Sequence, residues 1–199
     1  MSANTNISDL LQYVILDVPG CPLPVATQKV YLALQDFFKT TQTWRHTSDP
    51  VAIRAGVTRY DVDDIPRYTR VSAVVGVAID DQAKSPDTDF LYDDNEGQLV
   101  LVQEPEDDIA SGLVITSALY PTTEATQIPT AIYMRYFEGM AHGALWKLMV
   151  EPGKPWSNLP LAEYHSRQYD IARQHARHAM LRGTGTNRNV TMRPKHGWL

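Results

Sequence analysis

Residues 128–183 read IPTAIYMRYFEGMAHGALWKLMVEPGKPWSNLPLAEYHSRQYDIARQHARHAMLRG. Pro129 suits a first helical turn, and apolar side chains recur behind it at three- and four-residue spacing, so we predict a helix from Pro129 to Val150. The segment EPGKPW ends this helix, because two prolines and a glycine in six residues cannot continue it. Asn158 is expected to cap a further helix, rich in Ala and straight-chain residues, that ends near Gly183.

The chain upstream changes from helical to strand-like character. The proline-rich turn VPGCPLP precedes apolar residues at helical spacing, which predicts a helix over residues 24–43. Residues 50–120 contain short β-prone runs separated by turn residues. The group DDNEG at residues 93–97 is typical of a hairpin loop, because Asn and Gly tolerate a positive φ. We expect these runs to form a small antiparallel sandwich or barrel.

The expected fold class is therefore α+β, a bundle of three main helices with a β unit inserted between the first and the second. Residues 1–49 and 121–183 would form the helical domain, and residues 50–120 the inserted β domain. Residues 184–199 have no periodicity and much Gly, Asn and Pro, so we expect an extended arm there. Four small side chains on the last helix allow another helix to approach closely. They are Ala162, Ala172, Ala176 and Ala179.

Composition and charge limit the class of protein. The chain has 199 residues, of which 43% are apolar and 21% charged, as in a folded globular protein. Its single cysteine, Cys21, excludes an intrachain disulfide. No stretch approaches the ~18 apolar residues of a spanning helix, so we expect synthesis in the cytoplasm and no membrane partner.

The net charge of −5 is unevenly distributed. Residues 163–199 carry seven Lys/Arg and two Asp/Glu, whereas the preceding 162 residues carry 11 basic and 21 acidic side chains. A basic segment behind an acidic body favours docking, either self-complementary or onto a partner.

The motifs of common catalytic sites are missing from the sequence. No glycine-rich stretch carries a Gly-Lys-Ser/Thr pattern, and no G-x-S-x-G string is present. Cys21 lies in a proline-rich turn whose nearest histidine is His46, so nothing in its context indicates a thiol nucleophile. We therefore expect no enzyme and no cofactor.

The histidines of the last helix are the best metal candidates. His175 and His178 lie three residues apart and His165 lies ten residues before the first of them, so one helical face could present two ligands. Three arginines surround this pair with positive charge, which opposes cation binding. They are Arg173, Arg177 and Arg182. We interpret the histidines as polar surface or interface residues and expect no metal. The acidic runs EPEDD and YDVDD also lack the alternating ligands and central glycine of a calcium loop.

The arm combines basic and aromatic side chains: Arg188, Arg193, Lys195, His196 and Trp198. Such a combination is typical of nucleic-acid binding but also of protein docking. The acidic remainder of the chain would repel a phosphate backbone, so we expect a protein partner.

Three stretches of the chain resemble one family of virion proteins. They are VPGCPLPVATQKVYLALQDFFKTTQTWRH (Val18–His46), AGVTRYDV (Ala55–Val62) and the segment of residues 128–183 with its PGKPW corner. In this arrangement the chain resembles the head-to-tail adaptor (neck or connector) proteins of short-tailed bacteriophages, including the tail tubular protein A family.

The resemblance implies a structural protein of the virion neck, assembled in the host cytoplasm. Such a protein forms a ring, usually of twelve copies, between the portal protein and a tail or nozzle protein. Genomic DNA passes through the lumen without sequence-specific binding. The residues expected to dock on the portal are Arg173, Arg177, Arg182, Arg188, Met192, Arg193, Lys195, Trp198 and Leu199. Four acidic residues are hypothesised to line the lumen, where their charge would let DNA slide: Asp93, Asp94, Glu104 and Glu106.

Two alternatives stay open at this point. A tail-completion or baseplate subunit would use the β insertion to contact another tail protein and would not bind the portal. A small soluble enzyme or carbohydrate-binding β module would instead have a well-formed pocket with convergent polar groups.

Overall fold

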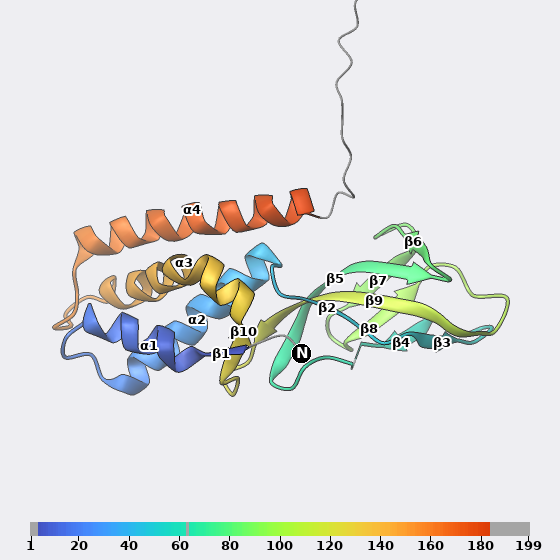
Figure 1. Cartoon of the computed structure of the whole chain (residues 1–199), viewed down its shortest axis with the longest axis horizontal. Coiled ribbons are helices and arrows are strands. Elements are labelled where there is room, and N and C mark those ends of the chain that lie inside the picture. Colours follow the sequence, from blue (N-terminus) through green and yellow to red (C-terminus); the bar gives the residue numbers. More distant parts are fainter. Residues whose placement is uncertain (1–3, 63, 184–199) are drawn as a thin grey trace, which may run out of the picture.

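The computed structural model describes residues 4–62 and 64–183 and shows an elongated molecule, with the helices gathered at one end and most strands at the other (Figure 1). The described part of the chain combines four helices with several antiparallel sheets, which confirms the predicted mixture of α and β structure, and its strands do not close into a barrel. The helices are α1 (Ile7–Leu16), α2 (Leu23–Thr41), α3 (Thr130–Met149) and α4 (Leu159–Gly183).

The three predicted helices lie within two residues of their expected bounds. Helix α2 ends where Gln42 adopts a left-handed conformation with φ of 53°. Asn158 accepts a hydrogen bond on Oδ1 from the backbone N–H of Leu161 at 3.2 Å, as expected of a capping residue at the start of α4. The proline and glycine punctuation around α3 and α4 therefore predicts both helix ends correctly.

Helix α1 corrects the expectation of three main helices. It is only ten residues long and buries Ile7, Leu10 and Val14. These side chains recur at three- and four-residue spacing, so the helical signal is present but brief. Short helices depend on tertiary packing for their stability, which a sequence pattern does not supply.

Two sheets lie between α2 and α3 in the sequence. In the larger one the strands follow the order β2-β9-β5-β6, and β3 also pairs with β9. The smaller sheet has the order β4-β8-β7, and a separate β1-β10 pair lies beside the helices. The bounds are β1 (Asn4–Asn6), β2 (Arg45–Thr47), β3 (Val51–Ile53), β4 (Arg59–Asp61), β5 (Thr69–Ile79), β6 (Gln82–Lys84), β7 (Phe90–Asp93), β8 (Gln98–Leu101), β9 (Ile109–Pro121) and β10 (Gln127–Pro129).

The predicted hairpin loop is confirmed between β7 and β8. Asp93 pairs with Gln98 across the ladder, and Gly97 takes a positive φ of 69°. The Asp93 carboxylate accepts a hydrogen bond from the backbone N–H of Asn95 at 3.0 Å. An acidic side chain of this loop is therefore part of the turn itself.

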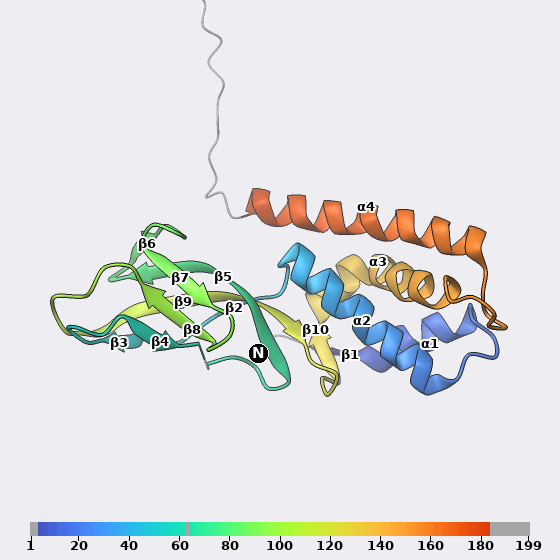
Figure 2. The same cartoon turned by 180° about the vertical axis from the view of Figure 1, so that it is seen from behind.

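Two apolar clusters hold these elements together. The larger one lies among the helices and reaches the adjoining ends of β5 and β9 through Val71 and Leu119. The smaller one joins side chains of both sheets, so the sheets pack against each other away from the helices (Figure 2). Its buried members are Ile53, Tyr60, Val77, Phe90, Leu99, Leu101, Leu113 and Ile115. The predicted domain boundaries stay a prediction, and the arm of residues 184–199 lies outside the described residues.

Candidate docking surfaces

The small side chains of α4 face α3 of the same chain. Ala162 and Ala176 are buried, and a Cβ added to Gly139 of α3 would collide with the side chain of Ala172. Gly143 is covered in the same way by the ring of Tyr169. The close helix approach that the alanines indicated is therefore made within the monomer, which leaves the opposite face of α4 uncovered (Figures 1 and 2).

That uncovered face of α4, here called the outer face, exposes large apolar side chains. Leu181 is 67% exposed, Leu159 60% and Tyr164 51%. Leu161 and Ile171 are exposed as well. Single exposed apolar residues are common. With 3.6 residues per turn, these five side chains are spread around the exposed side of α4 and do not form one row, and the exposed residues Glu163 and Asp170 lie among them.

The structure separates the three arginines of α4 that were predicted to dock. Arg177 and Arg182 are exposed near the end of the helix and make no ion pair with another described residue. Arg173 is half-buried, and its guanidinium donates to Asp36 of α2 at 3.1 Å and also to Asp170. Arg173 therefore fastens α4 to α2, and its charge is compensated within the chain. The other predicted docking residues lie outside the described residues: Arg188, Met192, Arg193, Lys195, Trp198 and Leu199.

The four acidic lumen candidates do not lie together. Asp93 and Asp94 belong to the loop at one end of β8, whereas Glu104 and Glu106 follow the other end of that strand. Four residues of extended chain separate these ends by about 13 Å. Asp93 is also occupied by its bond within the loop. The assignment of these four residues to a lumen stays a prediction.

Glu104 and Glu106 instead border a groove on the larger sheet. The loop between β8 and β9 is held down by two hydrogen bonds: Gly56 N–H donates to the carbonyl of Pro105 at 3.0 Å, and Ala55 N–H donates to the Asp108 carboxylate at 2.7 Å. Between this loop and strands β3, β5 and β6 lies a groove of about 280 Å³.

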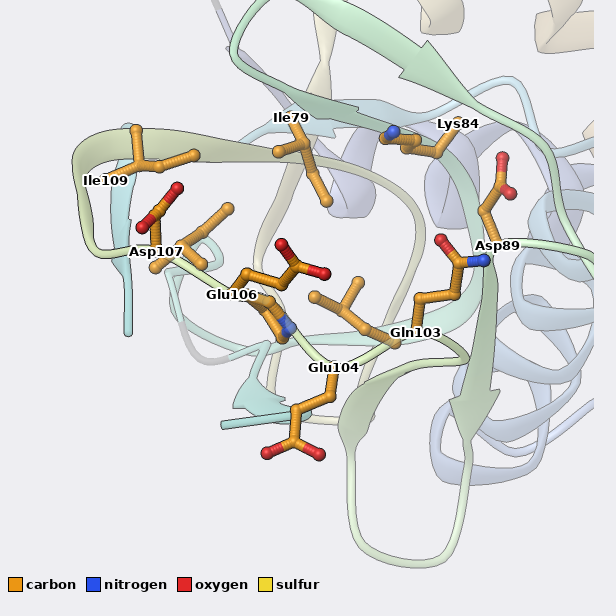
Figure 3. A pocket seen from close by; sticks show the side chains of 11 residues that line it. Ile79, Lys84, Asp89, Gln103, Glu104, Glu106, Asp107 and Ile109 are labelled. Carbon is orange, nitrogen blue, oxygen red and sulfur yellow. The ribbon is translucent and has the colours of Figure 1, made fainter. Parts of the chain in front are cut away.

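The groove has an apolar floor and an acidic rim (Figure 3). Glu106 points into the space beneath Ile79, Asp107 lies beside Ile109, and Glu104 points away from the groove (Figure 3). Lys84 is the one cationic side chain in the lining, against four carboxylates. The remaining lining residues are Ile53, Asp89, Leu101, Gln103, Pro105 and Ile109. Sequence reasoning noticed the acidic run EPEDD but not the apolar floor, which comes from strands far apart in the chain.

The histidines of α4 divide into two kinds. His165 is buried, and its Nδ1 lies 2.7 Å from Nδ1 of His142 on α3, so one ring donates to the other. Burial lowers the pKa of both rings, and the mutual repulsion of the pair lowers the pKa of His165 further, although Asp17 acts in the opposite direction. His175 and His178 are exposed. Within residues 4–62 and 64–183, no group of three or more His, Cys, Asp or Glu side chains is placed to hold a metal ion.

Cys21 is buried beside the helices, and burial raises the pKa of its thiol, as does the nearby charge of Glu151. A buried thiol with a raised pKa is a poor nucleophile. Among the described helices, none is long and apolar enough to cross a membrane. No model of a known protein family matches the chain, and no curated protein matches it significantly.

Proposed function

We propose that this chain is a structural subunit of a tailed bacteriophage, a head-to-tail adaptor that forms a ring beneath the portal and lets DNA pass. In this proposal the helices form a bundle that serves as the body of the ring, and the two sheets form a sandwich-like insertion. The residue stretches that resemble adaptor proteins belong to the helices and to the entrance of the insertion.

The outer face of α4 carries the proposal. It presents Leu181 beside Arg177 and Arg182, and the helix leads directly into the basic segment of residues 184–199. Arginine is enriched at protein interfaces, and the buried core of an interface is more apolar than its rim. Exposed leucine and arginine side chains at the end of this helix, next to a basic segment, support docking on another protein.

The charge of the insertion supports passage of DNA without binding. Residues 50–120 contain 14 Asp/Glu and five Lys/Arg. A surface with this excess of negative charge repels a phosphate backbone instead of holding it. The insertion is therefore the proposed source of the repulsive field, with Asp93, Asp94, Glu104 and Glu106 among its carboxylates.

The test measures the mass of the purified protein, alone and after mixing with rings of the portal protein from the same virus, by native mass spectrometry. An adaptor gives a stoichiometric ring on the portal. A protein that ignores the portal but binds a tail protein would instead be a tail-completion or baseplate subunit. A monomer that binds a small molecule would belong to the enzyme or binding-module class.

A matched pair of triple variants tests the outer face of α4. Leu181→Ser with Arg177→Ala and Arg182→Ala should weaken portal binding and reduce its dependence on salt, because apolar contact and charge are both lost. The control variant combines Leu91→Ser, Arg54→Ala and Arg70→Ala. It removes the same side-chain types from exposed positions of the insertion and should bind the portal normally. Equal binding by both variants would refute docking through α4.

A further inference from the structure

The groove on the larger sheet and the basic segment of residues 184–199 have complementary chemistry. The groove offers the carboxylates of Asp89, Glu106 and Asp107, one ammonium group and an apolar floor. The segment carries three basic side chains and no acidic one, together with Met192 and Trp198. At about 280 Å³ the groove is below the usual range for drug-sized ligands, which suits one or two peptide side chains.

We propose that the groove binds residues 184–199 of its own chain. An apolar side chain of the segment occupies the floor near Ile79 and Ile109, while its basic side chains lie against Glu106 and Asp107. Opposite charges placed at the rim of an apolar contact give the site its selectivity for a basic segment. This inference goes beyond the adaptor proposal and does not depend on it.

Helix α4 ends on the side of the helical part that faces the strands (Figure 1). Helices α2 and α4 both run toward the strands, at an angle to each other, and the Arg173–Asp36 ion pair joins them (Figures 1 and 2). Helix α2 ends five residues after Asp36, at Thr41, whereas α4 continues for ten residues after Arg173, to Gly183. At 1.5 Å per residue, α4 extends about 7 Å further than α2 toward the strands.

The segment is also long enough. Strand β2 follows α2 and pairs through Arg45 with Ala118 of β9. Ile109, in the floor of the groove, lies nine residues from Ala118 along the same strand, which corresponds to about 30 Å. Sixteen residues of extended chain span about 53 Å, so residues 184–199 can reach the groove from the end of α4.

Binding within the chain would have a direct consequence for assembly. A segment held on its own insertion is withdrawn from other copies, and a partner that binds the segment must first displace it. The intrachain contact therefore keeps the free subunit monomeric. It also makes a partner bind the full-length chain more weakly than it would bind the isolated segment of residues 184–199.

The experiment is paramagnetic broadening in the full-length protein. A nitroxide is attached at His196→Cys in a Cys21→Ala background, and methyl NMR signals of Ile53, Ile79 and Ile109 are recorded before and after reduction of the label. Binding in the groove predicts a strong loss of these signals that is restored by reduction and weakened at about 0.5 M salt, where the screening length is only a few ångströms. Unchanged signals would overturn the proposal.

Two comparisons locate the contact. The double variant Glu106→Gln, Asp107→Asn should remove the broadening. The control variant Asp94→Asn, Glu124→Gln removes two exposed charges elsewhere and should leave the broadening unchanged. Equal effects of the two variants would assign the attraction to net charge and overturn the groove as the binding site.

A mixing experiment separates binding within a chain from binding between chains. Isotope-labelled chains without nitroxide, mixed with nitroxide-labelled chains, should show no broadening. Broadening there would place the segment on a second copy and overturn the intrachain site.

Discussion

Gly143 of α3 is the position where adding one methyl group tests the helix packing most directly. A Cβ at this position would lie 2.6, 2.8 and 2.9 Å from three ring atoms of Tyr169. The ring cannot move away freely, because it is fully buried and its hydroxyl donates toward the carbonyl of Ala33 at 2.9 Å and the carboxylate of Asp36 at 3.0 Å. Gly143→Ala should therefore force α3 and α4 apart.

Two opposing effects set the magnitude. Replacing glycine by alanine inside a helix contributes about 0.8–1.0 kcal/mol of stability. Overpacking a closed core costs about 1–3 kcal/mol. The packing cost exceeds the helix-propensity gain over most of this range, so we expect Gly143→Ala to lower the free energy of unfolding by about 1 kcal/mol.

The assay is urea denaturation followed by circular dichroism, on a double-mutant cycle with Tyr169→Leu. In the Tyr169→Leu background the ring is absent, so Gly143→Ala should become stabilising by about 0.5–1 kcal/mol through helix propensity alone. If Gly143→Ala stabilises the wild-type protein as much as it stabilises Tyr169→Leu, the assigned contact between the two helices is wrong.

Three further substitutions are predicted from the described contacts. Arg173→Ala should lower the free energy of unfolding in urea by about 1 kcal/mol, because its pair with Asp36 is half-exposed and screened. Burial lowers the pKa of half-buried His142 and of buried His165, so the unfolded chain binds protons more readily than the folded chain. Thermal stability should therefore fall as the pH drops below about 6.5, and His165→Gln should reduce this dependence. Ile171→Ser should leave monomer stability within about 0.5 kcal/mol but weaken portal binding in light scattering.

Local sequence signals account for most of the helical part of the fold. Proline before α3, the EPGKPW corner and the Asn158 cap are short-range features whose effect on the backbone does not depend on tertiary contacts. The hairpin loop of residues 93–97 is predictable for the same reason, since Gly97 adopts the positive φ that the turn needs. Where the conformation is decided within a few residues, the sequence alone suffices.

The site features depend instead on contacts between distant segments. His142 and His165 lie 23 residues apart on different helices, and the groove combines the end of β5 with the loop before β9. Neither has a local pattern that would reveal it. The inward position of Arg173 did have a signal, because it follows buried Tyr169 by four residues and precedes buried Ala176 by three, which places all three on one helical face.

The arrangement of α4 explains why one helix can serve two surfaces. Its inner face carries Ala162, Ala172 and Ala176 together with Tyr169 and His165, and α3 approaches most closely where Gly139 meets Ala172 and Gly143 meets Tyr169. The leucines and isoleucine of α4 therefore lie on the outer face, where no described residue buries them. Water contact with exposed apolar side chains is unfavourable, by roughly 25 cal/mol for each Å² of apolar surface that a partner would otherwise cover. Because the inner face is closed by α3, only the outer face of α4 could contribute apolar surface to the proposed assembly.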